Sequence, residues 1–203
     1  PGVLAAQRAW TEAVPVMAHL APLLDGEPGK PVAVETEVGG WRLNAVLENV
    51  GPKGQVLWSV DALSPWVMLR AWCAHLLLNS DAGAPSHHTH LVDVEGIVSF
   101  LPEEDAASTL HELVGLYREG LCRPLPFFPR SAWAYVSAAK TPLANAYRTW
   151  AGSEHASAVG ESADPFFALA FRDRLDTVLD SEFESLASLV FDTPAQRVQE
   201  ARG

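Results

Sequence analysis

A proline-rich connector between two helical segments sets the strongest limit on how this chain can fold. The stretch Leu116–Tyr135 reads LYREGLCRPLPFFPRSAWAY. Gly120 favours the end of a helix, and the prolines after it forbid a helix from resuming before Ser131, because a proline lacks a backbone N–H and clashes with the preceding turn. These prolines are Pro124, Pro126 and Pro129. Ser131 is then expected to cap a second helix. We therefore predict a rigid elbow over residues 120–131, with its aromatic side chains available to pack.

Strand patterns occupy the middle of the chain. Val32–Val38, Trp41–Val50 and Gln55–Val60 alternate apolar and polar residues and are joined by glycine-containing turns. This pattern is typical of a three-stranded antiparallel meander. A further strand pair is predicted at Thr89–Val94 and Gly96–Leu101.

Helical patterns flank these strands and follow the elbow. Val3–Leu24 is one helix that Pro15 bends or splits, and Ser64 with Pro65 starts a second, largely apolar helix. The other expected segments are a helix at Ala106–Arg118, a helix at Ser131–Trp150, a polar loop at Gly152–Ala163 and a helical tail at Asp164–Val190. The order predicts an α/β fold, a mixed β-sheet flanked by helices.

Composition narrows the class of protein. Apolar residues make up 48% of the chain and charged residues 19%, which is typical of a globular domain. The net charge of −11 argues against a free-standing DNA-binding module, because such modules carry a basic surface for phosphates. No apolar run approaches the roughly 20 residues that span a bilayer. Cys73 and Cys122 lie in apolar helical contexts, so we expect buried free thiols, a reducing compartment and a cytoplasmic protein. Because the chain begins at Pro1 without a leader, we expect a segment of a longer protein.

The elbow also carries a family resemblance. The run YREGL…RPLPFFPRSAWAY resembles the C-terminal region of the RecC family, the gamma subunits of exodeoxyribonuclease V, and the likeness is strongest at 40–60 and 111–135. The resemblance implies a PD-(D/E)xK restriction-endonuclease-like core (αβββαβ) without its activity and with a helical C-terminal extension. We expect residues 1–150, elbow included, to form the core and 151–203 the extension.

Partners and cofactors follow from the same resemblance. It implies a complex with RecB-type and RecD-type subunits, acting on double-stranded and forked DNA in double-strand-break repair. The domain would scaffold that complex and help to hold and split the duplex. Mg²⁺ and ATP would be used by the partner subunits, and this domain would hold no cofactor.

A nuclease of this class needs carboxylates for Mg²⁺ and a lysine beside them. The lysines are Lys30, Lys53 and Lys140, and none follows an Asp/Glu-x pattern. Aligned as the third nuclease strand, the chain places Val60 and Ala62 at the carboxylate and lysine positions, while Glu48 stands where the second-strand Asp would be. We therefore expect no catalysis. The alternative is an active Mg²⁺-dependent nuclease with a displaced site at Glu48 and Asp61, in which Arg42 replaces the lysine.

Binding residues leave two interpretations open. The candidates for phosphate contact are Lys53, Arg118, Arg123 and Arg130. In the other interpretation Arg118 pairs with an acidic neighbour, Arg123 caps helix carbonyls, and both side chains are solvated. A pure protein-interaction module that never touches DNA is a separate alternative for the whole domain.

Histidine and tryptophan residues offer further candidate sites. His88 and His90 share one face of an extended segment, a two-ligand metal geometry, but we expect a solvated loop and no metal. Trp41 and Trp58 are predicted to pair across adjacent strands. The helical tryptophans are assigned to core packing: Trp10, Trp66, Trp72, Trp133 and Trp150.

Overall fold

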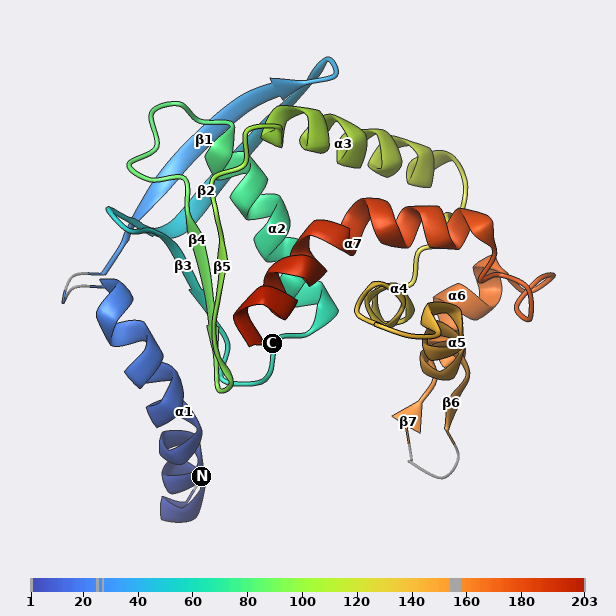
Figure 1. Ribbon diagram of the computed structural model, residues 1–203, viewed down its shortest axis with the longest axis horizontal. Coiled ribbons are helices and arrows are strands. Elements are labelled where there is room, and N and C mark those ends of the chain that lie inside the picture. The colour runs from blue at the N-terminus through green and yellow to red at the C-terminus, as the bar shows by residue number, and fades with distance from the viewer. Residues whose placement is uncertain (1, 25, 27, 154–157, 203) are drawn as a thin grey trace. The chain divides into compact units, whose positions relative to one another are not determined.

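The computed structural model describes residues 2–24, 26, 28–153 and 158–202. The chain divides into two compact units (Figure 1). Residues 1–114 with 200–203 form the first, which we call the sheet unit. Residues 115–199 form the second, the helical unit. The boundaries between the two units fall within α3 (Ala106–Cys122) and within α7 (Ser181–Arg202).

Within the described residues, the sheet unit contains a five-stranded mixed sheet in the order β1-β2-β3-β4-β5. The strands are β1 (Lys30–Val38), β2 (Trp41–Gly51), β3 (Gly54–Trp58), β4 (Thr89–Asp93) and β5 (Gly96–Phe100). β1, β2 and β3 are antiparallel neighbours, β4 runs parallel to β3, and β5 returns antiparallel to β4. The predicted meander, strand pair and α/β class are confirmed. The arrangement is consistent with a nuclease-like core followed by a helical extension.

Helices α1 (Val3–Leu24) and α2 (Pro65–Asn79) cover opposite faces of β3. Val56 of β3 packs in a cluster with Val16 and Leu20 of α1, whereas its neighbour Gln55 lines a cavity with α2. Consecutive strand residues point to opposite faces, which explains the division. Ser64 caps α2 as predicted, because its Oγ accepts from the Val67 N–H at 3.3 Å. α1 is unbroken, with its two prolines inside the helix.

The elbow residue Phe128 is the centre of the helical unit. Phe128 is 0% exposed, and its ring lies against four other aromatic rings. The centroid distances are 4.2 Å to Trp150, 5.0 Å to Phe167, 5.3 Å to Phe171 and 6.2 Å to Phe183. The elements around it are α4 (Pro129–Val136), α5 (Pro142–Ala151), η1 (Glu161–Ala163), α6 (Pro165–Ala170) and α7 (Ser181–Arg202). The expected packing of the elbow aromatics is therefore present.

Several expected helix boundaries are wrong. α3 (Ala106–Cys122) continues through Gly120, which a helix tolerates at modest cost. Phe128 is the N-cap of α4, with Pro129 next, so Ser131 lies inside the helix instead of capping it. The expected helix at Ser131–Trp150 is two helices, because Pro142 disfavours helical backbone at Thr141, where φ is 51°.

The C-terminal tail also differs from the expectation. Asp164 caps α6, which is short, and α7 begins only after Asp180 accepts hydrogen bonds from the N–H groups of Glu182 and Phe183. The predicted loop at 152–163 contains β6 (Gly152–Ser153), β7 (Ala158–Val159) and η1, and its residues 154–157 lie outside the described part.

Some expected side-chain environments are also wrong. Cys122 is exposed on α3, whereas Cys73 is mostly covered, and burial raises the pKa of its thiol. Trp10 and Trp66 are exposed, although Trp72 and Trp150 are in the core. Trp41 and Trp58 do not pair, because their register partners are Val38 and Val92.

Candidate functional site

A bulge in β2 places Glu48 at the end of the regular β1–β2 ladder. Lys30 pairs with Val50 and Val32 pairs with Leu47, so β2 carries one extra residue at this point. Asn49 takes up the extra length with a φ of 58°, a conformation that asparagine tolerates better than most residues. A Cβ on Gly29 would lie 2.3 Å from the Asn49 carbonyl carbon, so only glycine fits beside the bulge.

Beyond the bulge, β2 and β3 separate. Their described ladder has only two residue pairs, Val50–Gln55 and Gly51–Gly54, and Figure 1 shows the β1–β2 hairpin running away from β3, β4 and β5. A cavity of about 450 Å³ lies where the strands part, lined by residues 46–49 of β2, by 55 and 57–59 at β3, and by α2. We call this cavity the notch. It lies where the sequence predicted the nuclease carboxylate of the second strand.

The side chain of Gln55 links β3 to β2 at the point where the notch begins. Its side chain is only 2% exposed, and its Nε2 donates to the Glu48 carbonyl oxygen at 3.2 Å, where the backbone ladder has ended. Its Oε1 has no hydrogen-bond partner among the described residues. A buried acceptor without a donor is uncommon and calls for an explanation.

The notch lacks the groups of a nuclease site. On β3, Gln55 and Leu57 are the alternate residues that line it together with Glu48, and neither is a carboxylate or an amine. The expectation that β3 extends to Val60 is wrong: the strand ends at Trp58. Val60 and Ala62 therefore lie in the loop before α2, not on the strand, and neither lines the notch.

Asp61 and the lysines are also away from the notch. Asp61 is exposed in the same loop, and its N–H donates to Ser59 Oγ at 3.2 Å. Lys30 starts β1, Lys53 donates from the β2–β3 turn to the Pro22 carbonyl at 2.7 Å, and Lys140 follows α4. None of these residues is among those that line the notch.

Gln55 and Arg70 line the notch, but neither was predicted as a site residue from the sequence. Arg70 lies on α2 and is the one cation among the described lining residues. The available signal was weak: each is a polar residue within an apolar segment, and that pattern alone does not show which side chains face a common cavity.

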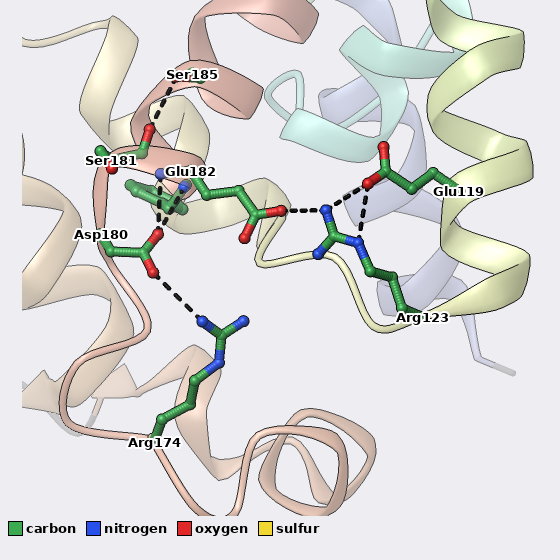
Figure 2. A network of polar contacts seen from close by, with 8 residues as sticks. Glu119, Arg123, Arg174, Asp180, Ser181, Glu182 and Ser185 are labelled. Carbon is green, nitrogen blue, oxygen red and sulfur yellow. Dashed lines mark hydrogen bonds and ion pairs between the residues drawn. The ribbon is translucent and has the colours of Figure 1, made fainter.

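The elbow arginines are mostly engaged with protein groups. Arg123 Nε donates to Glu119 Oε1 at 2.9 Å, and the guanidinium also pairs with Glu182 (Figure 2). Hydrogen bonds to Glu182 and Glu119 raise the pKa of Arg123. Arg130 donates to the Val159 carbonyl at 3.1 Å.

Arg118 differs from the other candidates for phosphate contact. It is exposed on α3 and forms no ion pair within the described residues. Arg123 is therefore held by protein groups, but these are carboxylates and not the helix carbonyls that were expected. Arg118 has no acidic partner in the described part of the chain, so the pairing expected for it is absent.

His90 is hydrogen-bonded at both ring nitrogens. Nε2 lies 3.0 Å from the Lys53 carbonyl and Nδ1 lies 2.8 Å from Ser99 Oγ, so Nε2 carries the hydrogen and donates to the carbonyl. Burial lowers the pKa of His90, and Lys53 and His88 affect it less. Among the described residues, no three His, Cys, Asp or Glu side chains gather as metal ligands.

The fold and the notch define an α/β domain with a mixed sheet, consistent with a nuclease-like core and a helical C-terminal extension. Residues 1–140 match the family of RecC C-terminal domains, and the chain belongs to this family.

A relative supports the assignment. The chain is 28% identical over 111 residues, 54% of its length, to the RecBCD enzyme subunit RecC of Escherichia coli strain K12. It covers 10% of that relative's length. Across the described residues, the structure has no helix long and apolar enough to cross a membrane.

Proposed function

We propose that this chain is a non-catalytic, nuclease-like domain of a RecC-type subunit in a RecBCD-type helicase–nuclease. It would scaffold the complex and help to hold and split duplex DNA during double-strand-break repair in the cytoplasm. Its partners would be RecB-type and RecD-type subunits, which would use the Mg²⁺ and ATP. Membership of the RecC C-terminal domain family supports this placement.

The residues that line the notch support the proposal that the domain has no nuclease activity. Glu48 is the one carboxylate among its described lining residues, with Gln55 and Leu57 on β3 and no lysine. A lone carboxylate holds Mg²⁺ poorly, because the ion needs several oxygen ligands. The notch therefore lacks the groups, several metal-holding carboxylates and a lysine, with which a nuclease of this class activates a water molecule toward a phosphodiester.

A cleavage assay tests this part. The purified chain is incubated with linear DNA and either Mg²⁺ or Mn²⁺, and we expect no cleavage. Cleavage that disappears in Glu48→Ala, and in Asp61→Ala, would instead establish the displaced nuclease site. Cleavage that persists in both variants would indicate a contaminating nuclease, which a second purification would remove.

Arg118 is the best candidate for a phosphate contact, because its guanidinium is exposed and is not held by a described carboxylate. In the whole complex, Arg118→Glu should weaken fork-DNA binding equally for different sequences and lower the salt slope by about one. Arg172→Glu is the matched control, because Arg172 is also exposed in the helical unit and pairs only weakly with Asp173, at 3.8 Å. If the Arg118→Glu complex binds fork DNA as tightly as the wild type, Arg118 does not contact a phosphate.

A pure protein-interaction module is the second candidate function. The acidity of the sheet unit favours it, since that unit contains six Lys and Arg residues against fifteen Asp and Glu residues. In this case the chain would show no fork-DNA binding even at low salt, and complexes that carry Arg118→Glu would bind DNA as the wild type does.

A further inference from the structure

Exposed tryptophans stand beside the notch. Trp58 lines it and is 50% exposed, and Trp66 on α2 is 55% exposed. Trp66 precedes Arg70 by four residues, so both lie on the same face of α2. Large aromatic residues left exposed beside a cavity are typical of protein-interaction surfaces, where tryptophan often contributes a large share of the binding energy.

The polar groups of the notch call for a hydrogen-bond donor. Gln55 Oε1 is buried without a described partner, and its Nε2 is already used by the Glu48 carbonyl. The amide therefore presents a fixed acceptor. The Glu48 carboxylate lines the same notch, is exposed and has no ion pair within the described residues. A guest that carries N–H donors would satisfy both groups.

The charge of the sheet unit selects among such guests. With six basic and fifteen acidic residues, this unit attracts a basic surface and repels a polyanion such as DNA. Lysine and arginine side chains bring donors at the end of an apolar stem, which suits an acceptor at the base of a notch with tryptophan beside it.

We propose that the notch between β2, β3 and α2 is a docking surface for a basic segment of a partner protein. A lysine or arginine head group of that segment donates to Gln55 Oε1 and Glu48, and its stem packs against Trp58. This inference rests on the proposed function, since it takes the partner to be one of the other two subunits. The positive charge of Arg70 repels the cationic head group and so weakens the docking of the basic segment.

Two charge changes of opposite sign give the sharpest test. Full-length RecC-type subunit is immobilised, and dissociation of the RecB-type and the RecD-type subunit is measured separately. For the subunit that docks here, Glu48→Lys should speed dissociation by about 10-fold, and Arg70→Glu should slow it by a similar factor. Arg42→Glu is the matched control on β2, outside the notch, and should change the rate by less than about twofold.

Two neutral substitutions test the acceptor and the aromatic wall. Gln55→Leu keeps the volume but removes the acceptor, together with the hydrogen bond to the Glu48 carbonyl, and Trp58→Ala removes the wall. Each should speed dissociation by about 10- to 30-fold. Trp41→Ala, which removes an exposed tryptophan elsewhere on β2, should leave the rate unchanged. Thermal unfolding of every variant checks the fold, and Trp58→Phe should recover part of the binding if Trp58→Ala unfolds the domain.

The possible failures are distinguishable. If both subunits dissociate at the wild-type rate from every notch variant, the docking inference is wrong while the proposed function stands. If Arg70→Glu weakens and Glu48→Lys strengthens binding of a single-stranded oligonucleotide, the guest is an anionic nucleic acid and the inference is again wrong. If the wild-type subunit binds neither partner, the proposed function fails together with the inference.

Discussion

Arg202 Nη2 donates a hydrogen bond to Asp93 Oδ2 at 2.7 Å and so joins the last turn of α7 to the end of β4. Asp93 is 0% exposed, and its carboxylate also accepts from the N–H groups of Leu63, Glu95 and Gly96 at 2.9–3.1 Å. One buried carboxylate therefore ties together the β3–α2 loop, the β4–β5 turn and the C-terminal end of the sheet unit.

Removal of the charged donor should destabilise the sheet unit. We expect Arg202→Ala to lower the free energy of unfolding by about 2 kcal/mol, because the buried carboxylate loses its counter-charge and keeps only backbone donors. Urea unfolding of the purified chain measures the loss. Glu95→Ala removes only the exposed partner of Arg202 and should cost well under about 1 kcal/mol. Equal losses in the two variants would contradict the central place of Asp93.

The same carboxylate should make stability depend on pH. Burial alone would raise the pKa of Asp93, but hydrogen bonds from Arg202, Leu63 and Glu95 outweigh it and bring the pKa below its ordinary value. An acid whose pKa is depressed on folding stabilises the fold above its unfolded pKa of about 4, and this contribution is lost as the pH falls through the folded pKa.

Asp93→Asn isolates this contribution. The variant should be less stable than wild type at pH 7, and the difference should shrink as the pH is lowered from about 4 toward 2. Urea unfolding across that pH range gives the comparison. A difference that stays constant with pH would show that the ionised carboxylate is not responsible.

Glu161 should be essential to the start of α4. Its carboxylate accepts from the N–H groups of Arg130 and Ser131 at 3.0 and 2.8 Å and from Ser131 Oγ at 2.8 Å. The N-cap residue Phe128 offers no side-chain cap, so Glu161 satisfies these N–H groups from a distant part of the sequence. We expect Glu161→Ala to cost about 3 kcal/mol and Ser131→Ala about 1 kcal/mol, by urea unfolding. A smaller loss for Glu161→Ala than for Ser131→Ala would refute this assignment.

The elbow should contribute to stability through its buried ring. Phe128→Ala removes a ring that contacts four others and should cost about 3–5 kcal/mol, because a cavity remains. Phe166→Ala is the matched control: Phe166 is 79% exposed on α6, and its loss should stay within about 0.5 kcal/mol. Melting temperatures of the two variants give the ranking, and similar values would show that the elbow is not the core of the helical unit.

Local patterns in the sequence were sufficient for most elements of the sheet unit. Alternation at Val32–Val38 and Trp41–Val50 predicted neighbouring strands, since one face of each is buried, and Ser64 predicted the start of α2 through its own hydroxyl. Where β3 ends could not be predicted, because Ser59 and Val60 continue the alternating pattern after the ladder to β4 has ended at Trp58.

The sequence by itself determined the family, the mixed α/β class and the absence of any carboxylate-x-lysine pair, because each depends on residue types at fixed spacing. Only the tertiary structure decided which side chains meet. The bulge at Asn49 and the parting of β2 from β3 bring Glu48, Gln55 and Arg70 around one notch, and the chain fold brings Glu161 to α4 and Arg202 to Asp93. These contacts join residues far apart in sequence, and local spacing carries no information about such distances.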